Sequence, residues 1–512
     1  DLDTAPYDRE TDLTYWEEDP EAAVKALNTC YTYLGNMDEQ LYCEAMTDNA
    51  YTKQPNDATQ NIGNGSYSTA DPYVKKVWDG RYTGIRMCNE LLENIDRVPD
   101  LDPELKKRYI GEAKVLRAYN YYELYTKFGD VPYTTKVLSI KESMSIARTA
   151  KATVIANVLA DLDEVINGNY LPTSYDADNK GRITRWAAMA IKAKIYLFEG
   201  NWTQVKNITS TIMTEGGFKL FGSYAGLFEI ANEYNSEVIL DAQYRPTSRE
   251  HQMMYAFLPP SLGGYSQLSP LQELVDSYIM LDGKTIKETG TSFDESNPYA
   301  NRDPRLKATV MYTGNSYTLA DGTEVVINCE KGEGKDGYGV GSDCSATGYY
   351  IKKYWDNTYR ATLYSGLNPI LIRYADILLM NAEALAELGE LDKMAWDATI
   401  KPIRDRAGFT LTSAVEFPEG ASKDKLIEIV RNERRSELAL EGHRHKDIIR
   451  WRIADDVLNG WCHGLKTNEV VGTDNGYVRV ENRAFNANRH YLWPIPQAER
   501  DLNGNLEQNP NW

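Results

Sequence analysis

The sequence contains no long hydrophobic run. Among its 512 residues, no stretch approaches the roughly 18 consecutive apolar residues of a membrane-spanning helix, so a protein built from such helices is excluded. A P-loop, a G-x-S-x-G motif and a G-x-G-x-x-G motif at the start of a helix are also absent. The corresponding nucleotide-binding and serine-hydrolase classes are therefore not indicated.

Metal-ligating residues are few and poorly spaced. None of the six cysteines belongs to a C-x-x-C pair, which argues against a zinc site. Of the five histidines, His443 and His445 are close neighbours, but at i and i+2 they point to different faces of a helix. A calcium-loop candidate begins at Asp176 but has Lys180 at its fifth position and Ala187 at its twelfth, where a carboxylate is required. We expect no metal and no cofactor.

Cys329 and Cys344 bracket a glycine-rich loop, CEKGEGKDGYGVGSDC. In an oxidising compartment, a disulfide between these two cysteines would stabilise the fold by about 3 kcal/mol, on the loop-entropy argument. Two free thiols are the alternative, and the sequence leaves both open.

Phenylalanine is scarce among the aromatic residues. The chain has 10 Phe against 36 Tyr and 10 Trp. Cores use Phe freely, whereas Tyr and Trp suit half-wet surfaces, where one ring face contacts a ligand and the polar atom contacts water. The net charge of −19 argues against nucleic acid and strongly anionic polymers as partners.

The segment from Leu426 to Trp451 combines helical periodicity with many charges. Its apolar residues recur at roughly helical spacing, interrupted at Gly442. Charged residues flank the apolar ones on both sides, so we expect some of them to lie in the interior as Glu–Arg–His pairs, because buried charges persist only when paired. Such a cluster would fix the register of the helix rather than do chemistry. A solvated helix face is the alternative.

Several amphipathic helices are predicted as pairs. One helix is expected at about 20–33, and a strong pair at about 72–96 and 104–128. Two further pairs begin at Ile183 and Leu371, and the first helix of each pair ends at a glycine, Gly200 or Gly389. Small residues, a terminal glycine and a second helix are typical of tetratricopeptide-type hairpins. The copies do not follow a fixed period, so we predict one scaffold interrupted by insertions.

The predicted fold is therefore mostly α, with a tetratricopeptide-like scaffold of helical hairpins and an irregular, loop-rich lobe. The scaffold covers about 19–215 and 369–460, and the lobe covers about 216–368 together with an irregular C-terminal tail, 461–512. Short β-like runs in the lobe lie at 237–242, 307–312, 324–328 and 349–354. Residues 48–71 lack apolar periodicity and are predicted to form a long loop.

Three loop segments carry aromatic residues suited to a sugar. A sugar ring has apolar C–H faces and a rim of hydroxyls, so a flat aromatic ring can stack on it while Asn, Asp, Gln or His side chains bond to the rim. The candidate residues are Tyr51, Asn61, Asn64 and Tyr67 in the first segment, His251, Tyr255 and Tyr265 in the second, and Trp355 and Tyr359 in the third. The alternative for each tyrosine is half-burial against the scaffold.

The segment 432–451 reads NERR-x-E-L-x-x-E-G-x-R-x-x-D-x-x-RW, and it resembles the signature near the C-terminus of the SusD/RagB family. Further matches follow in the family's order: NSE at 235–237, LQELV at 271–275, RDPRL at 302–306, RYAD at 373–376 and LWPIP at 492–496. They span nearly the whole chain, so the resemblance implies a single SusD-like domain over residues 1–512.

The resemblance implies a non-catalytic glycan-binding lipoprotein on the cell surface. Its expected partners are a polysaccharide or oligosaccharide, a SusC-like TonB-dependent transporter, and the outer membrane, reached through an N-terminal lipid anchor ahead of the DLDTAP opening. Tyr265 occupies the place where the starch-binding founder of the family stacks an aromatic residue on glucose, and His251 or Tyr255 is nearest to a second such place. The founder's Trp-rich first loop is replaced by one with Tyr51 and Tyr67, so starch itself is not predicted.

Two other functions stay open on the residues alone. A glycoside hydrolase on a helical scaffold predicts two acids in a cleft, one with a raised pKa, and the 75 acidic residues single out no such pair. An intracellular tetratricopeptide-type adaptor that binds peptides predicts more complete repeats and fewer loop tyrosines.

Overall fold

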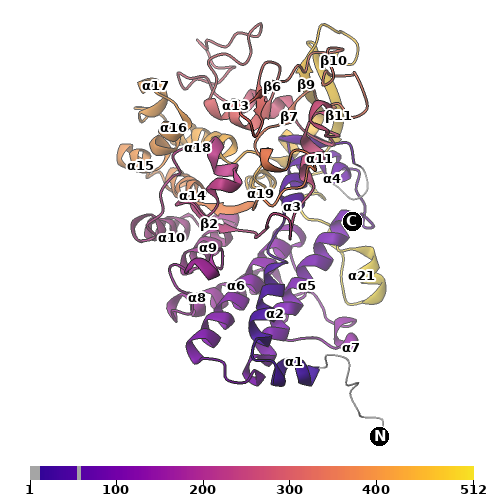
Figure 1. Cartoon of the computed structure of the whole chain (residues 1–512), viewed down its shortest axis with the longest axis vertical. Coiled ribbons are helices and arrows are strands. Elements are labelled where there is room, and N and C mark those ends of the chain that lie inside the picture. The colour runs from indigo at the N-terminus through magenta and orange to yellow at the C-terminus, as the bar shows by residue number, and fades with distance from the viewer. Residues whose placement is uncertain (1–11, 55–58) are drawn as a thin grey trace. The chain divides into compact units, whose positions relative to one another are not determined.

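The computed structural model describes residues 12–54 and 59–512, without the side chains of Leu13 and Tyr359. The described chain is mostly helical, with small antiparallel sheets (Figure 1). It divides into two compact units. The helical unit consists of residues up to Gly35, 68–195 and 492–512, and the mixed unit of residues 36–67 and 196–491. The predicted division into a scaffold and a ligand-binding lobe stays a prediction.

The longest helices of the helical unit start and stop where their sequence predicts. α5 (Pro72–Asn94) and α6 (Pro103–Phe128) each begin with proline behind an aspartate, Asp71 or Asp102, whose carboxylate accepts hydrogen bonds from the first free N–H groups. α6 ends at Gly129, where φ is 72°. The other helices are α1 (Asp12–Glu18), α2 (Ala22–Tyr31), η2 (Ile95–Arg97), α7 (Ile140–Ser143), α8 (Lys151–Asn167), η3 (Ala177–Asn179), most of α9 (Arg185–Glu199) and α21 (Gln497–Leu502).

The LWPIP segment packs into the core of the helical unit. The Trp493 ring meets Phe128 edge-on at 5.7 Å, and Phe128 meets Trp78 at 5.0 Å. The backbone N–H of Trp493 donates to the carbonyl of Lys127 at 2.8 Å. The end of the chain is thereby fixed against α5 and α6.

The mixed unit holds the remaining helices. They are α3 (Met37–Tyr42), η1 (Cys43–Met46), α4 (Gln60–Asn64), α10 (Trp202–Glu215), η4 (Ala225–Phe228), η5 (Ile230–Asn232), α11 (Met253–Phe257), η6 (Pro260–Leu262), α12 (Gln272–Ser277), α13 (Pro304–Thr309), η7 (Asn357–Tyr359), α14 (Tyr374–Glu387), α15 (Lys393–Ala398), α16 (Ile400–Ala407), α17 (Thr412–Val415), α18 (Lys423–Glu437), α19 (Arg444–Arg450) and α20 (Ala454–Val457). The predicted helical segment 426–451 is formed by α18 and α19, and the interruption expected at Gly442 extends over residues 438–443.

Short antiparallel strands pair in this unit. The pairs are β1 (Ala50–Thr52) with β3 (Leu268–Pro270), β2 (Val238–Asp241) with β8 (Ile370–Arg373), β4 (Val310–Met311) with β7 (Tyr350–Ile351), and β5 (Ser316–Thr318) with β6 (Glu324–Val326). The pairs β1 with β3 and β2 with β8 join segments that are far apart in sequence. A three-stranded sheet has the order β10 (Thr473–Asp474), β11 (Tyr477–Ala484), β9 (Asn459–Lys466).

Several local predictions were wrong. The tail after Trp461 was expected to be irregular, yet it contains the two eight-residue strands β9 and β11; register shifts near Arg479 interrupt the alternation that would reveal them. The run 307–312 begins as helix α13, because Asp303 caps it and Pro304 starts it. The helix expected from Leu371 starts at Tyr374 instead, because the preceding residues pair with β2. The predicted loop 48–71 contains β1 and α4.

Within the described residues, no helix is both long enough and apolar enough to cross a membrane. The core of the mixed unit is a large cluster of buried side chains that includes Leu41, Phe257, Leu274, Tyr350 and Leu440. It supports the short strands and the loops that follow them.

Candidate functional site

Three tyrosines of the mixed unit gather at its surface, and we call them the tyrosine platform. The rings of Tyr255 and Tyr265 are stacked, with centroids 5.6 Å apart and planes at 20°. Tyr364 meets Tyr255 edge-on at 6.5 Å. Tyr265 and Tyr364 are 47% and 38% exposed. Exposed rings held in this way offer contact area to the apolar face of a ligand at low entropic cost.

The backbone explains how Tyr265 reaches Tyr255. α11 buries its other side chains and leaves Tyr255 half-buried, and the chain then turns back through η6 and two glycines. The backbone N–H of Tyr265 donates to the Tyr255 carbonyl at 2.7 Å. A Cβ at Gly264 would lie 2.0 Å from the Leu258 carbonyl oxygen, so the turn is this tight only with glycine.

Lys53 and Asp336 attach the neighbouring glycine-rich loop to the platform. The Lys53 Nζ donates to the carbonyl oxygens of Tyr265 at 3.3 Å, Ser342 at 2.8 Å and Cys344 at 3.1 Å, and burial lowers the pKa of Lys53. Asp336 accepts hydrogen bonds from the backbone N–H and the hydroxyl of Ser261, at 2.9 and 2.6 Å. The three carbonyls occupy the ammonium donors, so Lys53 has a positioning role.

His251 supports the segment that carries Tyr364. It is 4% exposed, its backbone pairs with Ser365, and its Nε2 lies 3.2 Å from the Leu367 carbonyl oxygen. Burial lowers its pKa to about 4, so the imidazole is neutral at pH 7. His251 is therefore buried against the segment that follows Tyr364 and offers no exposed face to a ligand.

Trp355 lies beside the same segment. Its indole N–H donates to the Thr318 carbonyl at 2.8 Å, and its ring meets Tyr317 edge-on at 5.6 Å. The adjacent Asp356 accepts a hydrogen bond from the Ser365 hydroxyl at 2.7 Å. Tyr359 ends η7, but its side chain lies outside the described residues.

The candidates from the first loop are not part of the platform. Tyr51 is half-buried in β1, and its hydroxyl accepts a hydrogen bond from Gln60. Asn64 donates to Glu481 at 3.2 Å. Tyr67 is 4% exposed, with its ring 5.1 Å from that of His490. Asn61 lies within hydrogen-bond distance of Ser66.

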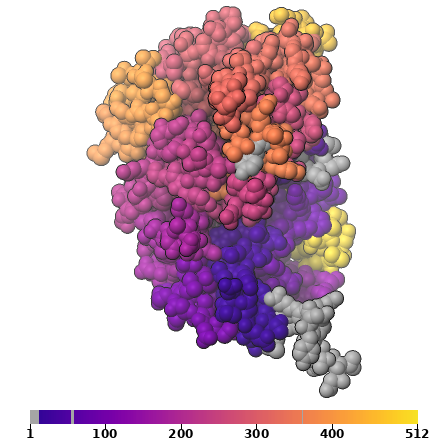
Figure 2. All heavy atoms as spheres, in the orientation of Figure 1, coloured from indigo at the N-terminus to yellow at the C-terminus, as the bar shows by residue number. Residues whose placement is uncertain are grey.

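Sequence analysis missed Tyr364. Tyr364 follows Trp355 and Tyr359 in the same tyrosine-rich stretch. The composition therefore predicted a site in this segment but did not single out Tyr364. Tyr364 contacts Tyr255 of α11, which is distant in sequence, so its place in the platform does not follow from the local pattern. In Figure 2, the segments on either side of residue 300 cover much of the visible face of the mixed unit.

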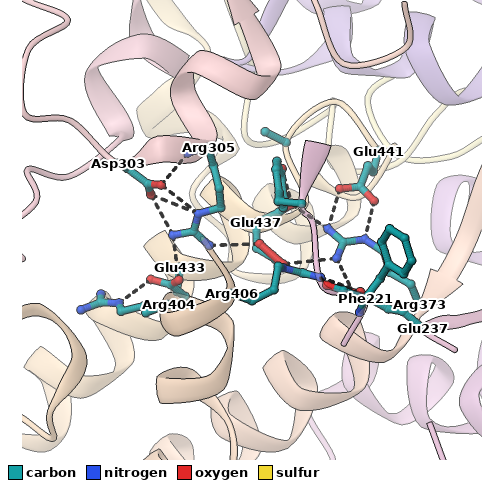
Figure 3. Close-up of polar contacts among 12 residues, drawn as sticks. Phe221, Glu237, Asp303, Arg305, Arg373, Arg404, Arg406, Glu433, Glu437 and Glu441 are labelled. Carbon is teal, nitrogen blue, oxygen red and sulfur yellow. Dashed lines mark hydrogen bonds and ion pairs between the residues drawn. The ribbon is translucent and has the colours of Figure 1, made fainter. Parts of the chain in front are cut away.

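A buried charge cluster stabilises the interior of the same unit (Figure 3). Glu437, on α18, pairs with Arg305 at 3.1 Å, with Arg373 at 3.2 Å, and also with Arg406. Burial alone would raise the pKa of Glu437, but the three guanidiniums outweigh burial and hold this pKa well below its ordinary value. The full set is Glu237, Asp303, Arg305, Lys353, Arg373, Arg404, Arg406, Glu433, Glu437 and Glu441.

The charge cluster is balanced, with five cations and five carboxylates. Every side chain in it is almost fully buried. The prediction of buried, paired charges in 426–451 is confirmed, and Arg434, which pairs with Asp376 at 2.6 Å and Asp447 at 2.7 Å, extends the pattern. With no spare charge, the cluster orders the packing of α16, α18 and β8.

One pair of acids has the raised pKa that a hydrolase would need. Burial raises the pKa of Glu233 to about 7 and that of Asp241 to about 6. Both are held by Asn368, whose side chain donates to Asp241 at 3.0 Å and whose backbone N–H donates to Glu233 at 2.8 Å. Asp241 is 3% exposed, so this pair is a structural contact rather than an open catalytic site. Cys329 and Cys344 are both free, buried thiols.

Exposed aromatic rings held by a well-packed unit are typical of a binding protein. A family model described as the SusD family matches residues 227–512. A second model, described as starch-binding and associating with the outer membrane, matches residues 17–197. The chain belongs to the SusD family, as the signature at 432–451 predicted.

Known SusD-like proteins align with nearly the whole length of this chain. A SusD-like protein of Formosa agariphila is 28% identical over 494 aligned positions, which cover 87% of this chain and 88% of that protein. The solved structure of a SusD-like carbohydrate binding protein from Bacteroides fragilis is 29% identical, with a TM-score of 0.86 over 96% of this chain and all of that one. A second SusD-like protein from B. fragilis is 27% identical, with a TM-score of 0.84 over 99% of this chain and all of that one.

Proposed function

We propose that this protein binds a polysaccharide or oligosaccharide at the tyrosine platform and releases it unchanged. The observation that carries the proposal is the stacked pair of half-buried Tyr255 and exposed Tyr265, with exposed Tyr364 at its edge. The 29% identical relative from B. fragilis, described as carbohydrate binding, supports the same ligand class.

The chemistry of the platform favours a neutral glycan. Stacking needs a flat apolar face, which the C–H side of a pyranose ring supplies, and the tyrosine hydroxyls and nearby carbonyls can bond to the hydroxyl rim. Lys53, which contacts the Tyr265 carbonyl, donates to three carbonyl oxygens in all, so it is poorly placed to pair with an anionic sugar. A net charge of −19 disfavours polyanions further.

Other predicted residues would contact a longer glycan or support the site. Trp355 and Tyr359 lie on the segment that leads to Tyr364, so we propose them as contacts for sugar units beyond the platform. His251 supports the segment that follows Tyr364. Tyr51, Asn64 and Tyr67 remain candidates only for a glycan that reaches the first loop, because each is engaged by another residue of the unit.

We also propose that the bound glycan is delivered to a SusC-like, TonB-dependent transporter. In this proposal a lipid anchor ahead of residue 1 holds the protein at the outer membrane, facing outward. The family model that matches residues 17–197 is described as associating with the outer membrane, and this description supports that location. Co-purification of the tagged, full-length protein with an outer-membrane barrel tests the partnership. Recovery of the protein from membranes without such a barrel would contradict it.

Affinity electrophoresis against soluble neutral polysaccharides tests the binding function. One polysaccharide is expected to retard the wild-type chain, and Tyr265→Ala is expected to weaken this binding by about tenfold through loss of the stacked ring. Tyr265→Phe is the matched control, because it keeps the ring and should keep most of the affinity. Size-exclusion chromatography of the glycan afterwards should show an unchanged length. Shortened chains would disprove the non-catalytic function.

A further inference from the structure

A polar cavity lies in the mixed unit, between α12, α18, α20 and β9, away from the tyrosine platform. We call it the Trp461 cleft. Its volume is about 460 Å³, and no residue of the tyrosine platform lines it. Residues that matter for its chemistry are Trp461 on β9, Asp276 on α12, Asn432 and Arg435 on α18, and Lys287. They come from four separate stretches of the chain.

Trp461 gives the cleft an exposed aromatic wall. It is 42% exposed, whereas the other nine tryptophans, all within the described part of the chain, are buried or half-buried. The guanidinium of Arg479 lies over the ring at 5.5 Å from its centroid and so occupies one face. The indole N–H has no hydrogen-bond partner among the described residues. An exposed tryptophan with a free donor, set in a concave site, is typical of ligand contact rather than of core packing.

Polar groups around Trp461 keep free bonding capacity. The Asp276 carboxylate accepts one hydrogen bond, from Gln272 at 2.8 Å, and its second oxygen has no partner among the described residues. Arg435 donates through Nε to Asn49 at 2.9 Å and through Nη2 to Asp48 at 3.1 Å, which leaves Nη1 without a described acceptor. A donor and an acceptor therefore line the same cleft as the aromatic ring.

The charges in the cleft are incompletely compensated. Burial lowers the pKa of Arg435 to about 10, because it outweighs the attraction of Asp48, and the neighbouring Arg444 adds repulsion. Burial also raises the pKa of Asp276. Both groups would gain from a polar partner. The lining mixes acids with Lys287, Arg435 and Arg483, so neither sign dominates and an ionic ligand is not favoured.

We propose that the Trp461 cleft is a second carbohydrate-binding site. It takes a neutral mono- or oligosaccharide whose ring stacks on Trp461, while sugar hydroxyls donate to Asp276 and accept from Arg435. The ligand class rests on the proposed function, but the location does not. Two sites on one unit would hold a single polysaccharide at two points, which raises its apparent affinity without a new contact.

Calorimetry with defined neutral oligosaccharides separates the two sites. The probes are maltohexaose, cellohexaose, laminarihexaose, xylohexaose and mannohexaose, titrated into the full chain. Wild type is expected to bind one of them with two sites per chain, and Tyr265→Ala and Trp461→Ala are each expected to retain one site. Asp276→Asn should weaken the cleft site by about tenfold, because it removes a charged hydrogen-bond acceptor.

Each outcome decides between the sites. Binding that Trp461→Ala leaves unchanged and Tyr265→Ala removes would overturn the cleft and leave the platform. Binding that Trp461→Ala removes and Tyr265→Ala leaves unchanged would support the cleft and overturn the platform. No binding of any probe would overturn the cleft proposal. If Trp461→Ala does not fold, Asp276→Asn and protection of the wild-type indole from acrylamide by the sugar give the answer, and absence of both effects overturns it.

Discussion

The buried charge cluster and the tyrosine platform belong to the same unit, and both are built from polar side chains. The cluster removes ten charged groups from water and compensates each with partners at hydrogen-bond distance. The platform holds uncharged rings against one another and leaves part of the Tyr265 and Tyr364 rings in water. Polar groups that find all their partners within the chain order the fold. Polar atoms and ring faces that stay exposed are available to a ligand.

The largest expected effect comes from breaking the charge cluster. Arg373→Met should destabilise the protein by about 3–5 kcal/mol, because Glu237, Glu437 and Glu441 would lose a shared cation inside the unit. Urea denaturation measures the loss. Arg86→Ala, which breaks an exposed pair with Glu90, is the control and should cost less than about 1 kcal/mol. Equal losses in both variants would contradict the distinction.

A buried carboxyl outside the cluster sharpens the comparison. Glu44 is 1% exposed and accepts hydrogen bonds from Asn49 at 3.0 Å and from the Gly442 N–H at 2.9 Å, but from no guanidinium. Burial raises its pKa to about 7. Because burial raises the pKa of Glu44 in the folded protein, its protonated form contributes stability at pH 4.5 and below. This contribution is lost as the pH rises through about 7.

Glu44→Gln should therefore be more stable than wild type at pH 8, by up to about 3 kcal/mol, and equal to it at pH 4.5. Chemical denaturation at pH 4.5, 6 and 8 gives the profile. Glu428→Gln, which changes an exposed residue of α18, is the control and should follow the wild-type profile. A parallel profile for Glu44→Gln would show that Glu44 does not titrate in this range.

The backbone beneath the platform should respond next in size. Gly264→Ala should cost about 1–3 kcal/mol, because the added Cβ would meet the Leu258 carbonyl oxygen and push Tyr265 away from Tyr255. Glycan affinity should fall with it. Gly341→Ala is a matched control, since its Cβ would meet nothing within 4 Å. If Gly264→Ala binds as wild type, the turn does not position the platform.

The smallest effect on stability is expected at the exposed edge of the platform. Tyr364→Ala should change the free energy of unfolding by less than about 0.5 kcal/mol, because the side chain is 38% exposed. Its glycan affinity should nevertheless fall by roughly threefold to tenfold, as expected for one lost aromatic contact. Parallel denaturation and binding measurements check both values. If Tyr364→Ala lowers the free energy of unfolding but leaves the glycan affinity unchanged, Tyr364 stabilises the fold and does not contact the glycan.

The sequence predicted the features of the fold that depend on local rules. Asp71 with Pro72 and Asp102 with Pro103 locate the starts of α5 and α6, and the periodicity of 426–451 predicted a charged yet buried helix. The partners of that helix were out of reach. Glu437 pairs with Arg305 and Arg373, which are far from it in sequence. No local pattern specifies which arginine becomes its partner.

The candidate site was predicted in part for the same reason. Tyr255 and Tyr265 stand ten residues apart across a Pro- and Gly-rich turn, so their proximity follows from nearby sequence. Exposure did not follow from composition: Tyr67 is buried and Tyr364 is exposed, although both lie in loop-like segments rich in tyrosine. Burial is decided by packing partners such as His490, which the sequence alone does not place.

The charge cluster also constrains how the protein folds. Its members range from Glu237 to Glu441, and two of its five carboxylates, Glu433 and Glu437, lie on α18 with a third, Glu441, shortly after it. A chain that stops before α18 would have to bury cations without their carboxylates, which is unfavourable, so we expect such fragments to remain unfolded. Because the cluster joins segments that are far apart in sequence, we expect its pairing to form only after those segments have come together.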